Sequence, residues 1–406
     1  MRSAAEGGAP RQATQTPATS ATPGPGETAT PGAPGDAPLG LAWGRTLDGD
    51  ARFVEVDANA RAWFRLADPG GGEDGVVVVS LRRPVERWAD LETVVEDQQE
   101  EVLRLGTMRD FFAVDPVAQR VWVGARYWAD GSWTTVSRDP SGVGGGLRHA
   151  SRVLLDGESR AGVPWQAVVD CPTPGGCVEH GLDRFTVEGE IDAELRFEPA
   201  PGAERDELLA SHLLPLDEDS GQAWVVARRA LMPLADLEAP VAYPPLADEN
   251  GAPNAGYVTA ATRRPDGAPL VFLWVERRDR PTLVHELSAI AWVDDGWVET
   301  LPTDVLTAAP FLSGDPGFDR VVAAAFDDLG RLWLAGNTGG VGVWSTEDEL
   351  WLARWSAAEL GLPPAARIRD LAVGSDGAVW LATSAGAWAG ARPVVGTLYL
   401  PICRVP

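Results

Sequence analysis

The stretch "RIRDLAVGSDGAVWLATSAGAW", residues Arg367–Trp388, decides the fold. An alternating apolar segment runs into a Ser-Asp-Gly turn, and a second alternating segment led by Trp380 follows. Asp hydrogen-bonds the backbone of a tight turn, and Gly adopts the positive φ that such turns require. The stretch therefore predicts an antiparallel hairpin whose second strand buries a large aromatic side chain between packed sheets.

The same pattern recurs six more times along the chain, each time with an apolar strand, a turn containing Asp and a strand that carries Trp. The seven tryptophans are Trp63, Trp122, Trp165, Trp224, Trp274, Trp333 and Trp380. On average they lie about 53 residues apart, close to the ~40–50 residues of a four-stranded propeller blade. We therefore expect an all-β chain forming a seven-bladed β-propeller. Six or eight blades remain open, because the third and fifth units match weakly.

Closure of such a ring requires strand exchange between the two ends of the chain. The segment "LGLAWGRTL" (39–47) is the candidate to complete the last blade, alongside "AGAWAG" and "GTLYLPI". Within the blades, "GSWTTVS" (131–137) and "GVGVWS" (340–345) are predicted to be third strands. The acidic segment 85–106 is compatible with a short helix or with a long outer strand.

Two stretches resemble a known repeat: "GLPPAARIRDLAVGSDGAVWLATSAGAW" and "VAAAFDDLGRLWLAGNTGGVGVW". They are similar to the two-component-regulator propeller repeat, in which GLP precedes an apolar strand, Asp-Gly and an apolar-Trp strand. Only the C-terminal part of the chain carries the pattern well. The resemblance implies a β-propeller of the kind found in extracellular ligand-sensing domains and in the related streptogramin lyases. A fold of this kind hosts many functions.

The charge balance excludes some partners. The chain has 59 acidic and 34 basic residues, a formal net charge of −25. A surface this acidic repels phosphate backbones and anionic lipids, so we expect no binding to nucleic acid and no docking on membranes. No run of ~18 apolar residues is present, so no membrane insertion is expected. We expect a monomer whose partner is a small-molecule or protein ligand.

Residues 1–38 contain the Thr/Pro/Gly-rich run "ATQTPATSATPGPGETATPGAPGDAP". Such a composition buries too little apolar surface to fold, so we predict a disordered linker before a propeller domain at 39–406. Linkers of this kind tether exported domains, which favours an extracellular or cell-surface location with the export signal upstream. A cytoplasmic protein with a disordered tail is the alternative.

Cys171 and Cys177 flank the turn-rich sequence "PTPGG". An exported protein meets an oxidising environment, in which so short a loop can be closed by a disulfide. Two free thiols are the alternative. The spacing matches no zinc-binding pattern, and Cys403 is left without a partner.

Counting four residues on from each Trp gives a candidate ligand-binding ring. Its members are Arg126, Arg228, Arg278, Asn337 and Ser384. The planar fork of Arg suits carboxylate or phosphate, so a small anionic ligand or an acidic peptide fits, with Tyr127 and Trp128 as a stacking wall. The competing interpretation is that these arginines pair with acidic loops of neighbouring blades.

Groups able to catalyse a reaction are few. Glu179-His180 is an adjacent acid–histidine pair, and it supports a weak alternative: a lyase or hydrolase resembling streptogramin lyases. No cofactor is expected, although acidic pairs could hold Ca²⁺ if they are not simply solvated turns. These pairs are Asp217-Glu218-Asp219, Asp294-Asp295 and Asp327-Asp328.

The leading hypothesis is therefore a non-enzymatic, exported β-propeller that binds a ligand on its loop face. A purely structural or adhesive surface module is the third possibility.

Overall fold

A computed structural model describes the strands of the chain and the tighter turns between them. The described residues are 39–67, 75–81, 93–97, 112–115, 120–123, 126–129, 132–135, 151–155, 162–170, 179–186, 191–196, 210–216, 222–228, 230–237, 240–244, 246–247, 253–254, 257–277, 284–301, 305–306 and 320–392. Several sequence predictions lie outside them, among them the linker 1–38, the Cys171–Cys177 loop, the acidic run Asp217–Asp219 and Arg278.

The strands form seven four-stranded sheets, each antiparallel and, with one exception, built from consecutive strands. In the first four sheets the strands are β2 (Asp50–Val56), β3 (Ala62–Ala67), β4 (Gly75–Leu81) and β5 (Thr93–Asp97); β6 (Phe112–Val114), β7 (Val121–Val123), β8 (Arg126–Ala129) and β9 (Ser132–Thr135); β10 (Ser151–Leu155), β11 (Gly162–Asp170), β12 (Glu179–Phe185) and β13 (Ile191–Arg196); and β14 (Ala210–Pro215), β15 (Ala223–Ala227), β16 (Ala230–Pro233) and β17 (Val241–Ala242).

The remaining sheets are β20 (Tyr257–Arg263), β21 (Pro269–Arg277), β22 (Val284–Val293) and β23 (Gly296–Leu301); β24 (Val321–Phe326), β25 (Arg331–Gly336), β26 (Gly340–Ser345) and β27 (Leu350–Ser356); and β28 (Ile368–Val373), β29 (Val379–Thr383) and β30 (Gly386–Ala391) together with β1 (Ala42–Asp48). A two-stranded sheet, β18 (Leu246–Ala247) with β19 (Pro253–Asn254), is separate.

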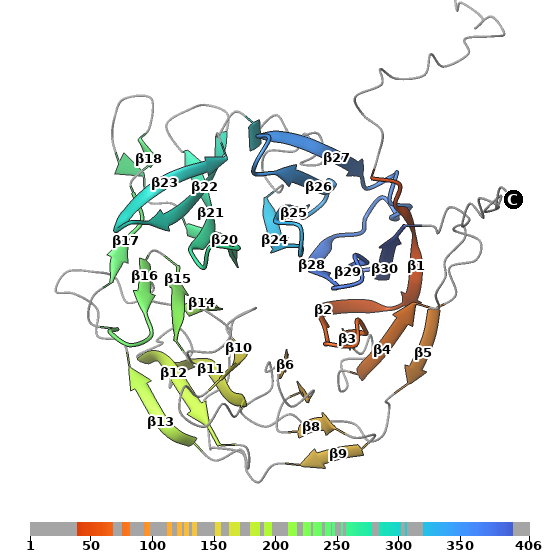
Figure 1. The fold of residues 1–406 in the computed structure, drawn as a ribbon, viewed down its shortest axis with the longest axis horizontal. Coiled ribbons are helices and arrows are strands. Elements are labelled where there is room, and N and C mark those ends of the chain that lie inside the picture. The colour runs from red at the N-terminus through yellow and green to blue at the C-terminus, as the bar shows by residue number, and fades with distance from the viewer. Residues whose placement is uncertain are drawn as a thin grey trace, which may run out of the picture. The chain divides into compact units, whose positions relative to one another are not determined.

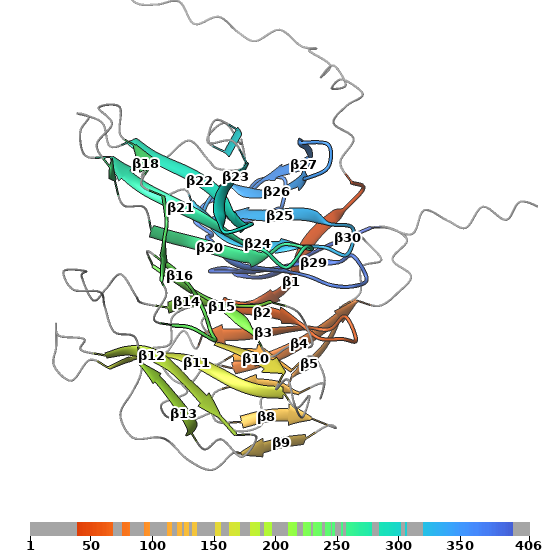
Figure 2. The same cartoon turned by 60° about the vertical axis from the view of Figure 1, so that its left-hand side comes forward.

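The sheets stand around a common centre (Figures 1 and 2). The first strand of each sheet contacts the first strand of the next, in the order β2, β6, β10, β14, β20, β24, β28 and back to β2. This is a closed ring of inner strands, with the second, third and fourth strands of each sheet farther out. The prediction of an all-β propeller is confirmed.

The blades are not equivalent. Six sheets contain at least one strand of six residues or more. In the sheet β6–β9 every strand is three or four residues long. The structure thus has six full-length blades, whereas seven were predicted and six or eight were left open. The counting of tryptophans does not register how short the strands around Trp122 are.

Strand exchange closes the ring. β1 pairs with β30, so that Trp43 lies opposite Gly390 and Arg45 opposite Trp388. A Cβ at Gly390 would come within 2.8 Å of the Trp43 ring, so only glycine allows this indole to lie against the strand. The predicted closing role of 39–47 beside "AGAWAG" is confirmed, whereas "GTLYLPI" lies outside the described residues.

The assignment of third strands was half right. "GVGVWS" is β26, the third strand of its sheet. "GSWTTVS" instead contains β9, the fourth strand, because β7 ends after three residues and Arg126–Ala129 already forms the third strand. Within the segment 85–106, the residues described are the outer strand β5.

Two of the predicted Asp turns show how Asp and Trp act together. Asp57 Oδ1 accepts hydrogen bonds from the backbone N–H groups of Asn59 and Arg61, while its Oδ2 accepts from Arg61 Nε and Trp63 Nε1. One carboxylate therefore caps the turn between the first two strands and fixes the buried indole. The turn at Asp327 repeats this arrangement with the backbone N–H groups of Leu329 and Arg331, with Arg331 Nε and with Trp333 Nε1.

The last blade departs from this pattern. Gly374 occupies the place of that Asp, six residues before Trp380. Asp376, the turn residue singled out in the sequence, accepts a bond from the backbone N–H of Ala378 instead. The turn at 374–378 therefore lacks the Asp–Trp hydrogen bonding seen at Asp57 and Asp327.

The core lies between neighbouring sheets. Trp333 of β25 stacks on Trp355 of β27 with ring centroids 6.0 Å apart, and both belong to a buried cluster that includes Ile368 and Leu371 of the next sheet. Burial of such large apolar side chains contributes most of the stability of a β-propeller. Among the described residues, no helix is long and apolar enough to span a membrane.

Candidate functional site

One face of the ring is formed where the first strand of each sheet begins and the second strand ends. The two ends meet because the strands are antiparallel: Ile368 pairs with Thr383, and Val321 pairs with Gly336. We call this the start face. Arg228, Asn337 and Ser384, from the ligand ring predicted in the sequence, lie in its turns after the second strands.

The backbone at two of these positions joins neighbouring sheets. The carbonyl of Asn337 accepts a bond of 2.8 Å from the N–H of Ile368, and that of Arg228 accepts one of 3.2 Å from the N–H of Val258. In both cases the donor belongs to the first strand of the next sheet. Ser384 works within its own sheet, where its Oγ accepts a bond of 2.9 Å from the N–H of Arg367. These positions therefore have structural roles through which they also fix the start face.

The turn that carries Arg228 is stabilised by hydrogen bonds from the side chain of Tyr243. The hydroxyl of Tyr243 lies 3.0 Å from the carbonyl oxygen of Ala227 and 2.9 Å from that of Ala230, and donates its proton to these two acceptors. Burial raises the pKa of the Tyr243 hydroxyl well above 10.0. A neutral tyrosine thus ties together the two ends of this turn.

Arg126 is the first residue of β8 rather than a turn residue, but it pairs with Val123 at the end of the second strand and so also lies at the start face. The two aromatic residues that follow it are used in packing. Tyr127 packs on Trp122 with ring centroids 5.0 Å apart, and Trp128 lies 6.4 Å from Trp63. Both rings therefore take part in packing within and between sheets.

The acid–histidine pair lies at the start of β12. In the register of the sheet, Glu179 is opposite Asp170 and His180 is opposite Val169. The backbone thus brings Asp170, which precedes the Cys171–Cys177 loop in the sequence, next to this pair.

The acidic pairs considered for Ca²⁺ serve as turns where they are described. Asp294 and Asp295 have φ of 49° and 59° and form the two-residue connection between β22 and β23. The carboxylate of Asp327 accepts hydrogen bonds from the side chains of Arg331 and Trp333. Over the described part of the chain, no three His, Cys, Asp or Glu side chains are grouped so as to hold a metal ion.

The inner strands share a feature that the sequence did not reveal. Five of the seven contain a β-bulge just after the start face, where one residue is skipped in the pairing. The skipped residues are Arg52, Ser211, Thr259, Val322 and Arg369. A bulge re-aims side chains and is frequent beside binding sites. Arg369 uses this position to reach Asp50 of the first sheet, with Nη2 2.8 Å from Oδ1.

Sequence reasoning also missed two arginines that immediately precede inner strands. Arg320 and Arg367 are exposed, and their carbonyls accept bonds from the N–H groups of Asn337 (3.0 Å) and Ser384 (2.9 Å). The carbonyl of Asn337 also accepts the bond from the N–H of Ile368, the residue after Arg367. Asn337 therefore links the two adjacent sheets that carry Arg320 and Arg367. The signal lay in "DRVV" and "ARIRD", but counting forward from each Trp passed over residues that precede a first strand.

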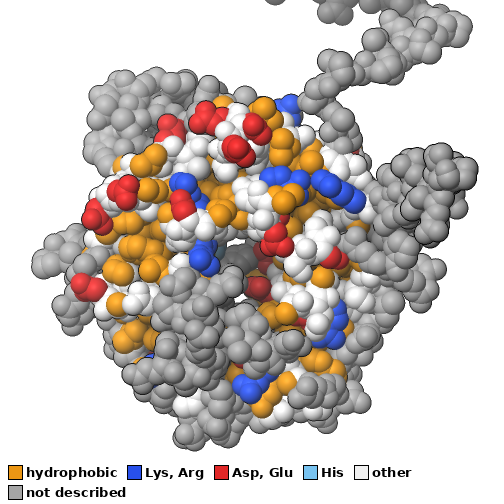
Figure 3. Space-filling view, in the orientation of Figure 1, with side chains coloured by type: hydrophobic (Ala, Val, Ile, Leu, Met, Phe, Trp, Pro, Cys, Tyr) orange, Lys and Arg blue, Asp and Glu red, His pale blue; other side chains and the backbone are white. Residues whose placement is uncertain are grey.

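We call Arg320, Arg367 and Arg369 the arginine cluster. Arg369 is 31% exposed, so all three guanidinium groups are accessible to solvent. The space-filling view shows a central opening with acidic and basic side chains around it (Figure 3). Of the three, Arg369 is paired with Asp50, whereas Arg320 and Arg367 are exposed at the starts of two adjacent sheets.

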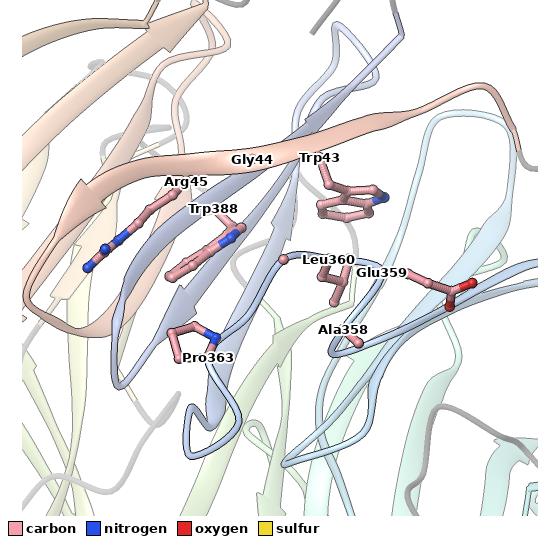
Figure 4. Close-up of a pocket in the computed structure, with 9 residues that line it drawn as sticks. Trp43, Gly44, Arg45, Ala358, Glu359, Leu360, Pro363 and Trp388 are labelled. Carbon is pink, nitrogen blue, oxygen red and sulfur yellow. The ribbon is translucent and has the colours of Figure 1, made fainter. Parts of the chain in front are cut away.

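A pocket of about 460 Å³ lies between the last two blades. One wall is β1, the other is the connection from β27 to β28, and Trp388 of β30 lies between them (Figure 4). It is lined by Trp43, Gly44, Arg45, Ala358, Glu359, Leu360, Gly361, Pro363 and Trp388. The residues of its two walls, at 43–45 and 358–363, lie about 300 positions apart in the chain, so no local sequence pattern could have indicated the pocket.

No family model matches the chain, and no curated protein matches its sequence. The fold of the chain is similar to that of several solved structures. The extracellular domain of the hybrid two-component system BT4673 from B. thetaiotaomicron is 10% identical with a TM-score of 0.51. A second structure of the extracellular domain of BT4673 is 9% identical with a TM-score of 0.50. Both alignments cover 86% of this chain but only 39% of the other.

A streptogramin B lyase structure is 11% identical over 88% of this chain and 99% of its own, with a TM-score of 0.49. The resemblance to sensor propellers is thus confirmed at the level of the fold. Identities this low do not transfer an activity.

Proposed function

We propose that the chain is a non-enzymatic, ligand-binding β-propeller, and that it holds a small anionic ligand or an acidic peptide on the start face. The observation that carries the proposal is the arginine cluster. Arg320 and Arg367 stand at equivalent positions of adjacent sheets, exposed on a backbone fixed through Asn337. A rigid backbone that presents guanidinium groups loses little conformational entropy on binding. Each guanidinium can bind a carboxylate or phosphate through a bidentate pair of hydrogen bonds.

The site extends the ring predicted in the sequence. Arg228 belongs to the same face, and Arg126 and Arg278 keep their predicted role within the proposal. We also propose that the short sheet β6–β9 serves as a blade of the ring. An exported, extracellular location fits the proposal, because the BT4673 domain of similar fold is extracellular.

Thermal unfolding of the full chain against citrate, inorganic phosphate and triglutamate tests the function. A ligand at about 100 times its Kd adds about 2.7 kcal/mol to the free energy of unfolding, which is readily visible as a rise in Tm. We expect a rise with at least one of these anions. No rise with any of them contradicts anion binding and favours the adhesive alternative.

The double variant R320Q/R367Q then tests the location. Each lost charge-assisted hydrogen bond costs about 1.5–3 kcal/mol, so affinity should fall at least tenfold per residue. The matched control is R354Q, which removes an exposed charge from the outer strand β27. If R126A/R228A/R278A abolishes binding while R320Q/R367Q does not, the ligand occupies the sequence-derived ring instead.

A further inference from the structure

The pocket between the last two blades has a charged end that a ligand could use. The guanidinium of Arg45 lies 5.4 Å from the centroid of the Trp388 ring. Its Nη2 donates a bond of 2.7 Å to the carbonyl of Ala385 and also pairs with Asp48. The Asp48 side chain is 85% exposed, and an ion pair so open to water contributes little. A ligand carboxylate can therefore replace Asp48 while Arg45 stays anchored through Ala385.

Between its charged ends, the pocket is lined mainly by residues with apolar side chains. Its floor includes Leu360 and Trp388, which are 1% and 2% exposed, and Pro363 and Trp43 stand at its sides (Figure 4). A volume of about 460 Å³ falls within the range of small-molecule sites. An aromatic or aliphatic group of a ligand would displace water from the exposed parts of Trp43 and Pro363, which favours binding.

Glu359 limits the charge that a ligand can carry. It lines the pocket at the end away from Arg45, and its Oε2 accepts bonds from the N–H and Oγ of Ser356 (2.7 and 2.8 Å). The fixed carboxylate at this end disfavours a second anionic group. A ligand with one carboxylate therefore fits this pocket better than a ligand with two.

We propose that this pocket binds a small apolar monocarboxylate, with the carboxylate on Arg45 and the aryl or alkyl body over Trp43 and Pro363. The inference rests on the proposed binding function and adds a second site with its own ligand class. The ligand would bridge β1, which closes the ring, to the connection between β27 and β28. Binding thus stabilises the docked position of β1 by mass action.

Isothermal titration of the full chain with 3-phenylpropionate tests the proposal, with 3-phenylpropanamide as its neutral analogue. We expect the carboxylate to bind, and the amide to bind at least about tenfold more weakly. R45Q should weaken binding of the carboxylate by a similar factor, and R354Q should not. Equal affinities for acid and amide, or no binding of the acid, overturn the proposal.

A second pair of variants covers the case in which R45Q loosens β1. A358F places a ring inside the pocket without touching Arg45, and should abolish binding of 3-phenylpropionate. A365F is the control, because Ala365 is exposed on the same connection but does not line the pocket. Hydrogen exchange should show slower exchange of the β1 amides when the acid is bound. Unchanged binding by A358F contradicts the assignment.

The same titration separates this proposal from the proposed function. Loss of 3-phenylpropionate binding in R45Q but not in R320Q/R367Q assigns it to the pocket. Loss in R320Q/R367Q alone assigns it to the start face and overturns the pocket. If the acid does not bind at all, the pocket is overturned, while citrate, phosphate and triglutamate still decide the start face.

Discussion

At the scale of single residues, one carboxylate organises a blade. Asp57 and Asp327 each accept two backbone N–H bonds, an Arg and a Trp indole, and the indole is then held at the centre of the sheet packing. Asp327 is nearly buried, with 6% of its side chain exposed. The acid is thus a structural element of the turn, which explains why it recurs with Trp in the sequence.

Asp327→Ala should lower the free energy of unfolding by about 2–4 kcal/mol. The substitution leaves the Trp333 indole and two turn amides without their acceptor, and unsatisfied buried donors are costly. Asp328→Ala is the control, because Asp328 is exposed in the same turn and should change stability by less than about 0.5 kcal/mol. Urea unfolding measures both. Equal effects of the two variants would contradict this role of Asp327.

Much of the fold was predictable at this scale. The Asp turns and the Trp strands are local features, and their physical cause lies within a few residues. The candidate site was less predictable. The interval from Trp to turn changes when a strand is short, as at β7, so counting placed Arg126 in a turn where the structure has a strand. Arg320 and Arg367 were passed over because they precede inner strands rather than follow the Trp strands.

At the scale of elements, the start face is held rigid by contacts beneath its turns. The Tyr243 hydroxyl bonds both ends of the turn at Arg228, and the carbonyl of Arg228 in turn accepts from Val258 of the next sheet. This turn thus fixes its own sheet and the seam to the next sheet. A binding face built on such turns is pre-organised for its ligand.

Tyr243→Phe should lower the free energy of unfolding by about 1–2 kcal/mol near neutral pH, because two buried carbonyls lose their donor. The variant should also be less sensitive to alkaline pH. The pKa of Tyr243 is raised above its ordinary value of 10.0 by burial, so above pH 10 the folded state holds more protons than the unfolded state. Stability of the wild type therefore falls as the pH rises through this window.

Urea unfolding of both proteins between neutral pH and pH 11 measures the difference. The gap between the wild type and Tyr243→Phe should narrow as the pH rises above 10. A gap that stays constant, or that widens, would show that Tyr243 does not titrate as its buried position requires.

At the scale of the whole molecule, the ring depends on the seam between its first and last sheets. β1 completes the last sheet, Arg369 pairs with Asp50 of the first sheet, and Asp370 Oδ2 accepts a bond of 3.1 Å from the N–H of Val54. The seam is thus closed by backbone pairing on the outside and by polar bonds on the inside. The pocket lies next to β1, which links its occupancy to this closure.

Removal of residues 1–48 should abolish cooperative unfolding or lower Tm strongly, because it uncovers the edge of β30 and deletes one wall of the seam. Removal of residues 1–38 alone should leave Tm unchanged, since the predicted linker contributes no core. Calorimetry of the two truncated chains measures this. A large loss of stability on removing 1–38 would contradict the predicted domain boundary.

The central claim, an anionic ligand on the start face, is tested most directly by hydrogen exchange of the full chain with and without the best-binding anion. The account predicts slower exchange at 320–322, 337–339 and 367–369, where the arginine cluster and its supporting turn lie. Slowing confined to the opposite face, at the turns 57–61 and 327–331, would contradict it.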